Sequence, residues 1–144
     1  MRKLPMGEGA VVRSYLDELA ALDAPLAGSD DPRFSVMRKA LAPAVAALRE
    51  ATEWLISCED PNDRLAGASP YLDMFGTVAG GAYLIRMALA AAAEERDAWL
   101  DAKIDTAAFY AHQILPRATG WLSASTAGAA ELFAIPVDGL EAAR

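Results

Sequence analysis

The residues whose types and spacing most suggest chemistry are three glycines close together, Gly76, Gly80 and Gly81. A glycine-rich loop can hold a phosphate with its backbone N–H groups, so such a run is a candidate nucleotide or phosphate site. This run does not match Gly-x-Gly-x-x-Gly, no strand-like segment precedes it, and no Lys-Ser or Lys-Thr pair follows it. We therefore interpret the run as a point of close helix packing, with ligand contact in a shallow groove as the alternative.

A single histidine, His112, and a single cysteine, Cys58, limit the remaining chemistry. They are too few for a Cys/His zinc cluster. A di-iron helical bundle uses Glu-x-x-His pairs, whereas Phe109 stands three residues before His112. No Gly-x-Ser-x-Gly motif supplies a nucleophile for His112 to activate. We predict no metal ligands, no cofactor-binding residues and no catalytic residues, and we expect His112 at the boundary between core and solvent.

Arg86 is the charged residue in the most apolar surroundings. Helical spacing places it beside Ala79, Ala82 and Leu89. Its aliphatic stem can lie along such a surface while the guanidinium group reaches water or an ion-pair partner. An anion-binding or interface role is the alternative.

Length and composition predict one domain over residues 1–144. The chain is 54% apolar, which excludes ordinary disorder. The net charge is −7 and the cations are scattered among acids, which argues against nucleic acid as a partner. The apolar stretch 74–93 carries Arg86 near its centre, so we expect a core helix and no membrane insertion. The absence of a signal-peptide pattern and the single cysteine favour the cytoplasm.

Helical periodicity predicts an all-α fold, an antiparallel up-down four-helix bundle with a short C-terminal helical turn. The helices are expected over residues 8–23, 31–58, 69–93 and 97–125. Pro25 and Gly28 should end the first helix, and the residues from Glu59 to Asp63 should form a turn. The pairs Asp31-Pro32 and Ser69-Pro70 are typical of a cap followed by proline in the first turn.

The buried side of each later helix is predicted from apolar residues three and four apart. The second helix should bury Phe34, Met37, Leu41, Val45, Leu48, Thr52 and Leu55. The third should bury Tyr71, Phe75, Val78, Ala82, Ile85, Leu89 and Ala92. The fourth should bury Ile104, Ala108, Ala111, Leu115, Ala118 and Leu122, with Ala107, Tyr110, Ile114 and Trp121 beside them. Pro43 and Pro116 should bend their helices.

We place the reversal between the third and fourth helices at residues 94–97, with Asp97 as the cap. Because no glycine or proline lies between Ala82 and Pro116, one long helix open to domain swapping is the alternative. The tail residues Leu132, Phe133 and Ile135 are expected to form a helical turn that packs back on the bundle. Residues 1–8 are interpreted as a linker-like start and residues 136–144 as a loose tail.

Several stretches together resemble one protein family. The run Pro70-Tyr71-Leu72-Asp73-Met74-Phe75-Gly76-Thr77-Val78-Ala79-Gly80-Gly81 is similar to the PYLxLFGxVAGG run of large bacterial acyl-CoA dehydrogenases of the 3-methylmercaptopropionyl-CoA dehydrogenase type. The stretch from Ala107 to Pro116 resembles ARFYAEHLLP in their extra C-terminal helical domain. The residues from Thr126 to Ala129 match its TAGA ending, and Arg2-Lys3-Leu4-Pro5 resembles the linker before it.

The resemblance implies a domain of an enzyme that uses FAD, in which a glutamate removes the α-proton of an acyl-CoA and a hydride passes to the flavin. The family's flavin-binding domains and catalytic base precede the linker, and no stretch here matches them. We therefore expect a detached structural or subunit-interface module with no cofactor of its own. Its expected partners are the catalytic domains or a second copy of the chain.

Three readings remain open from the sequence. In the first, Tyr83, Phe109, Tyr110 and Trp121, with His112, form an apolar interface. In the second, the bundle binds an acyl chain or acyl-CoA in a slot beside Gly76 and Gly80, with Arg86 at its mouth. In the third, the chain is the C-terminal part of a split acyl-CoA dehydrogenase, active only when joined to the catalytic part.

Overall fold

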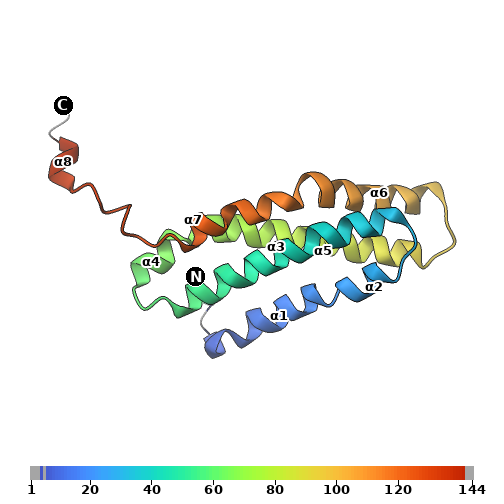
Figure 1. Ribbon diagram of the computed structural model, residues 1–144, viewed down its shortest axis with the longest axis horizontal. Helices are drawn as coiled ribbons and strands as arrows, with labels where there is room; N and C mark the ends of the chain where they lie inside the picture. The colour runs from blue at the N-terminus through green and yellow to red at the C-terminus, as the bar shows by residue number, and fades with distance from the viewer. Residues whose placement is uncertain (1–3, 5, 142–144) are drawn as a thin grey trace.

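The computed structural model describes residue 4 and residues 6–141 (Figure 1). These residues form helices and no β-strand, so the prediction of an all-α fold is confirmed. The elements are η1 (Met6–Gly9), α1 (Ala10–Ala20), α2 (Asp23–Ala27), α3 (Pro32–Ser57), α4 (Pro61–Ala66), α5 (Ala68–Ala92), α6 (Ala98–Gln113), η2 (Leu115–Trp121), α7 (Leu122–Thr126) and α8 (Val137–Glu141).

The long helices lie side by side and alternate in direction along the chain (Figure 1). The chain passes along the molecule through α1 and α2, returns through α3, passes back through α5 and returns again through α6, η2 and α7. Helix α5 packs against both α3 and α6, and α3 also contacts α6 and α1. The core is therefore enclosed between α3, α5 and α6, with α1 covering one side.

Helix α3 matches its prediction closely. The carboxylate of Asp31 accepts a hydrogen bond from the backbone N–H of Arg33, and Pro32 occupies the first turn. All seven residues predicted for its buried seam are buried, from Phe34 to Leu55. Pro43 lies inside α3 and leaves the helix unbroken.

The buried side of α5 differs from its prediction. Tyr71, Val78, Ala82 and Ile85 are buried as expected. Phe75 and Leu89 are only partly buried and Ala92 is exposed, whereas Met74, Gly81, Ala88 and Ala91 lie in the interior. The reason is that α5 is apolar on several faces, so periodicity alone does not single out the face that meets α3 and α6.

The seam of the fourth helix is also displaced in part. Ile104, Ala111, Leu115 and Ala118 are buried as predicted. Ala107, which was placed on the adjacent strip, is buried, whereas Ala108 and Leu122 are only partly buried.

The predicted reversal before α6 is confirmed. Helix α5 ends at Ala92 and α6 begins at Ala98. Asp97 is the N-cap, and its carboxylate accepts a hydrogen bond of 2.8 Å from the backbone N–H of Leu100. The alternative of one continuous helix is therefore wrong, because the cap gives the chain a defined start for α6.

Three helix boundaries differ from prediction. Pro25 lies inside α2 rather than ending a helix, because the first turn leaves its N–H groups unpaired and so tolerates proline. The expected turn at residues 59–63 contains the start of α4, where Asp60 caps the backbone N–H of Asn62. Helix α5 starts at Ala68 with Gly67 as its N-cap, so Ser69 is not a cap.

Pro116 changes the type of helix. The segment predicted as one bent helix over 97–125 is α6, then the 3₁₀ helix η2, then the short α7. Proline supplies no N–H to continue the α pattern, and the N–H of Arg117 instead bonds the carbonyl of Ile114 at 3.0 Å, a tighter 3₁₀ turn.

The tail, defined as residues 130–139, does not pack back on the bundle. Leu132, Phe133 and Ile135 are 69%, 69% and 62% exposed, so that prediction is wrong. Gly128, with φ of 75°, turns the chain, and the carboxylate of Asp63 accepts a hydrogen bond of 2.7 Å from the N–H of Ala129. Beyond this anchor the tail leads away from the helices to α8 (Figure 1). Part of the predicted linker-like start and of the loose end lies outside the described residues.

Candidate functional site

The glycine run of α5 is covered by a neighbouring helix at Gly80 and Gly81 and is open to solvent at Gly76. The ring of Tyr110, from α6, covers Gly80 and Gly81, and its hydroxyl donates a hydrogen bond of 3.0 Å to the carbonyl of Thr77. A Cβ at Gly81 would lie 3.2 Å from Tyr110 Cε1 and 3.1 Å from Leu115 Cδ1. A Cβ at Gly76 would meet nothing within 4 Å. The two later glycines therefore admit Tyr110, and this contact fixes α6 against α5.

Arg86 joins α5 to α1. One of its terminal nitrogens lies 3.7 Å from a carboxylate oxygen of Glu18, and its guanidinium lies 5.6 Å from the ring centroid of Tyr83. This geometry matches the ion-paired reading of Arg86. Gly76 and Gly80 line none of the larger hollows described below, so the structure offers no support for a slot with Arg86 at its mouth.

The five predicted interface residues do not share one environment. Tyr83 and Phe109 are 60% and 62% exposed, and His112 is exposed. Tyr110 and Trp121 are partly buried and pack against the core. His112 borders a shallow hollow with Val36 and Lys39 of α3, whereas Tyr83 faces α1.

An apolar hollow with a volume of about 620 Å³ lies between α1 and α5. We call it the α1–α5 groove, and it is lined by Leu4, Val11, Val12, Tyr15, Tyr71, Phe75, Ala79 and Tyr83. Tyr15 of α1 stacks on Phe75 of α5 with ring centroids 5.6 Å apart, so two of its lining side chains join the helices. No charged side chain lines it in the part of the chain that the structure describes, so it suits an apolar occupant.

A narrower hollow of about 520 Å³ separates α1 and α2 from α3. Its floor includes Leu19 and Leu41, which are almost inaccessible, and Arg38 and Arg49 stand on its rim. Arg38 is paired with Asp23 at 2.7 Å, and Arg49 with Asp17 at 2.6 Å. Both cations are engaged in cross-links between helices, so this hollow offers no ready anion site.

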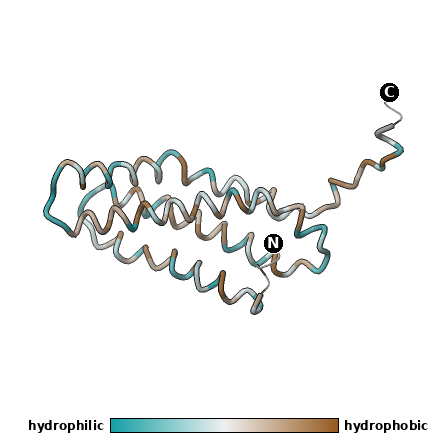
Figure 2. Tube along the Cα trace, turned by 180° about the vertical axis from the view of Figure 1, so that it is seen from behind, coloured by the Kyte–Doolittle hydropathy of each residue, from teal (hydrophilic) through white to brown (hydrophobic). Residues whose placement is uncertain are grey.

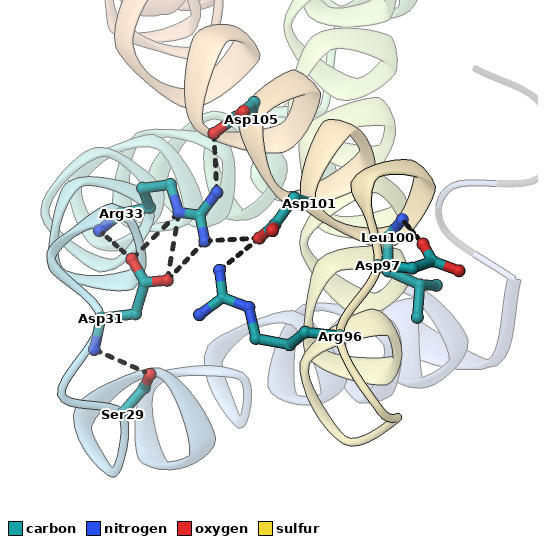
Figure 3. Close-up of polar contacts among 8 residues, drawn as sticks. All are labelled: Ser29, Asp31, Arg33, Arg96, Asp97, Leu100, Asp101 and Asp105. Atoms are coloured by element: carbon teal, nitrogen blue, oxygen red, sulfur yellow. Dashed lines mark hydrogen bonds and ion pairs between the residues drawn. The ribbon is translucent and has the colours of Figure 1, made fainter.

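A cluster of charged side chains closes the end of the bundle where α3 and α6 begin (Figure 3). We call it the loop-end cluster, made of Asp31, Arg33, Arg96, Asp101 and Asp105. Arg33 bonds Asp31 at 2.6 Å, Asp105 at 2.7 Å and Asp101 at 3.2 Å. Arg96 also contacts Asp101. The cluster ties the start of α3 to α6 and to the loop before α6. Each of its three carboxylates contacts at least one of the two guanidinium groups.

The loop-end cluster predicts a dependence of stability on pH. The guanidinium of Arg33 lowers the pKa of Asp31 from 3.8 to about 2. Since the folded-state pKa is the lower one, ionised Asp31 stabilises the fold above about pH 4, and this contribution disappears as the pH falls through about 2. We expect Asp31→Asn, which keeps a helix-capping side chain, to be less stable than wild type at pH 7 but equal to it near pH 2. Urea unfolding at several pH values measures the difference, and a constant difference would contradict the prediction.

A comparison with protein-family models gives a match over residues 12–136, to the model described as acetyl-CoA dehydrogenase C-terminal like. The chain belongs to this family of acyl-CoA dehydrogenase C-terminal domains. The matched range runs from α1 to the residue before α8 and includes most of the α1–α5 groove, the glycine run and the loop-end cluster. Comparisons with curated proteins and with solved structures gave no match.

This acyl-CoA dehydrogenase C-terminal domain holds no assembled catalytic set among its described residues. His112 Nδ1 makes its hydrogen bond with the amide of Gln113, its neighbour in the chain. Cys58 bonds the carbonyl of Trp54, and burial raises the pKa of its thiol, which disfavours a reactive thiolate. No group of three or more metal-ligating side chains occurs within residues 4 and 6–141.

Sequence reasoning missed the α1 side of the α1–α5 groove of this domain. Val11 and Tyr15 are four residues apart and therefore share a face of α1 beside the buried face of Leu16 and Leu19. This second apolar face of α1 was the feature of the sequence that could have predicted the groove. Which helix it would meet depends on the tertiary arrangement.

Proposed function

We propose that this domain is a non-catalytic packing module of an acyl-CoA dehydrogenase, and that α5 presents the surface that binds the catalytic body. The proposal extends to the 3-methylmercaptopropionyl-CoA dehydrogenase type, on the similarity of the glycine run and of the stretch from Ala107 to Pro116. Flavin binding and proton abstraction would belong to the catalytic domains. The hollows of this domain, with apolar linings and paired rim cations, suit packing better than a charged cofactor.

The observation that carries the proposal is the apolar outer side of α5. Of its 25 residues only Asp73 and Arg86 are charged. Its exposed residues turned away from the core are mostly apolar and include Leu72, Gly76 and Tyr83, with Asp73 beside them. Leu72 and Tyr83 are 70% and 60% exposed. A helix that is apolar on all sides is normally covered on all sides, so this face favours a protein partner.

Among the helices in the described part of the chain, α5 has the length and apolar composition of a membrane-spanning helix. The buried core helix of a globular domain passes the same test, and α5 supplies Tyr71, Met74, Val78 and Ile85 to the core. The guanidinium of Arg86, in the C-terminal half of α5, favours a protein surface over lipid. We therefore assign the outer face of α5 to a protein partner.

A charge placed on the outer face of α5 tests the proposal. A Cβ at Gly76 would meet no atom within 4 Å, so Gly76→Arg should fold, but the added guanidinium would lie within the interface. We expect it to weaken binding to the flavin-containing catalytic domains of an acyl-CoA dehydrogenase from the same source by about tenfold or more, measured by calorimetry.

Gly120→Arg is the matched control. Gly120 lies in another helix, η2, and a Cβ there would also meet nothing within 4 Å. It should bind like wild type. Equal binding of the Gly76→Arg and wild-type domains, or no binding by wild type, would refute the proposal. Flavin absorbance retained by the purified domain would refute the assignment of FAD to the catalytic domains.

A further inference from the structure

The tail and the α1–α5 groove are two unpartnered apolar surfaces on one chain. In the tail, Leu132, Phe133, Ile135 and Val137 are 69%, 69%, 62% and 71% exposed. Its hydrogen bonds are local, such as those from Phe133 N–H to the Ala129 carbonyl and from Gly139 N–H to the Pro136 carbonyl. Figure 2 shows this segment as mostly hydrophobic while it extends away from the bundle. Four large apolar side chains exposed to water within six residues favour a binding partner.

We propose that the tail of one chain docks in the α1–α5 groove of a second copy, and that two chains exchange tails symmetrically. The groove of about 620 Å³ is apolar and aromatic, so it can take large side chains such as Phe133 and Ile135. One groove and one tail per chain allow both to be filled in a twofold dimer. The proposal does not rest on the proposed function, because its partner is a second copy of the chain; the two surfaces share Tyr83, and the substitutions that test them lie at other residues.

Charge also favours the tail as the occupant. The ionisable side chains of the tail are acidic, Glu131 and Asp138. Arg86 stands near the Tyr83 end of the groove, and its contact with Glu18 is long, at 3.7 Å. The guanidinium is thus placed to form an ion pair with a second carboxylate. Opposite charges at the edge of an apolar contact give it orientation.

The root of the tail favours docking on a second copy over docking on the same chain. Gly128 and the bond from Ala129 N–H to Asp63 fix the direction in which the chain leaves α7. From there the tail points away from its own bundle (Figure 1). The α1–α5 groove is instead lined by residues of α1 and α5. A second molecule can meet the extended tail without a change at this anchor.

Light scattering after size exclusion tests the proposal on the full chain. We expect wild type to be a dimer, and Phe133→Glu in the tail and Val11→Glu in the groove each to weaken it by about tenfold or more. Both positions are exposed, so the helices should remain intact by circular dichroism. Leu65→Glu, at an exposed apolar residue of α4 outside the groove, is the matched control and should leave the dimer unchanged.

Mixing the two defective chains gives the sharper result. The Val11→Glu chain keeps its tail and the Phe133→Glu chain keeps its groove, so the mixture should form a heterodimer through one intact contact, weaker than the wild-type dimer. A wild-type monomer at every concentration, including one with the tail folded on its own groove, would overturn the proposal. A dimer that both variants leave intact, or a mixture that does not associate, would overturn it as well. None of these outcomes bears on the binding of catalytic domains tested with Gly76→Arg.

Discussion

Replacement of Met74 by alanine is expected to lower the free energy of unfolding by about 2–5 kcal/mol, the range for removing a large buried apolar side chain. Met74 is fully buried where α5 meets the core. The loss combines the transfer free energy of the removed atoms with the cost of the cavity left between helices. Urea unfolding followed by circular dichroism measures it.

Leu72→Ala is the matched control, two residues away on the same helix. Leu72 is 70% exposed, so its replacement should change the free energy of unfolding by no more than about 0.5 kcal/mol. A small effect at Met74 together with a large one at Leu72 would mean that α5 is rotated about its axis relative to this structure. In that case the outer face of α5 would be buried and the proposed function would lose its basis.

The second large effect is expected at Gly67, where alanine should destabilise the fold by about 1–3 kcal/mol or more. A Cβ there would lie 2.2 Å from the backbone oxygen of Ser125 and 3.2 Å from Leu55 Cδ2. The backbone of α7 cannot yield as a flexible side chain can, so α7 and the start of α5 must separate. The φ of Gly67 is −79°, which alanine adopts without strain. The predicted loss of stability therefore comes from the close contact with Ser125 and not from the backbone conformation.

Gly76→Ala tests the same substitution without the contact. Gly76 lies inside α5 with open space around its missing Cβ, and alanine there should stabilise the domain by up to about 1 kcal/mol through helix propensity. Thermal unfolding should therefore shift downward for Gly67→Ala and upward for Gly76→Ala. A shift in the same direction for both would contradict the close approach of α7 to Gly67.

The open space at Gly76 also shows why the glycine run was only partly understood from its spacing. The sequence indicated close packing, and Tyr110 does pack on Gly80 and Gly81. The spacing grouped Gly76 with Gly80, whereas the neighbouring helix covers one and leaves the other open. Because a glycine has no side chain, the sequence does not indicate whether it is covered by a neighbouring helix. Only the position of α6 shows that Gly80 is covered and Gly76 is not.

Local sequence signals were sufficient where the physics is local. Asp31 and Asp97 were predicted as helix caps because a carboxylate can satisfy the N–H groups of its own first turn, and both do so. Every residue predicted for the seam of α3 is buried, because the large apolar side chains of that helix follow a clear helical period, although the buried residues Ala44, Ala47 and Ala51 were not predicted. The all-α class and the family resemblance at the level of the C-terminal domain followed from the same kind of short-range pattern.

The tertiary structure decided what depends on distant partners. Arg33 meets Asp101 and Asp105, 68 and 72 residues away, and no local pattern encodes those pairs. The face of α5 that is buried was set by α3 and α6, because a helix that is apolar on several faces carries little contrast to orient it. The tail resembled a segment that would pack on its own bundle, yet the turn at Gly128 carries Phe133 and Ile135 away from it. The hydrophobic effect favours the burial of such side chains, but the path of the backbone determines which surface they can reach.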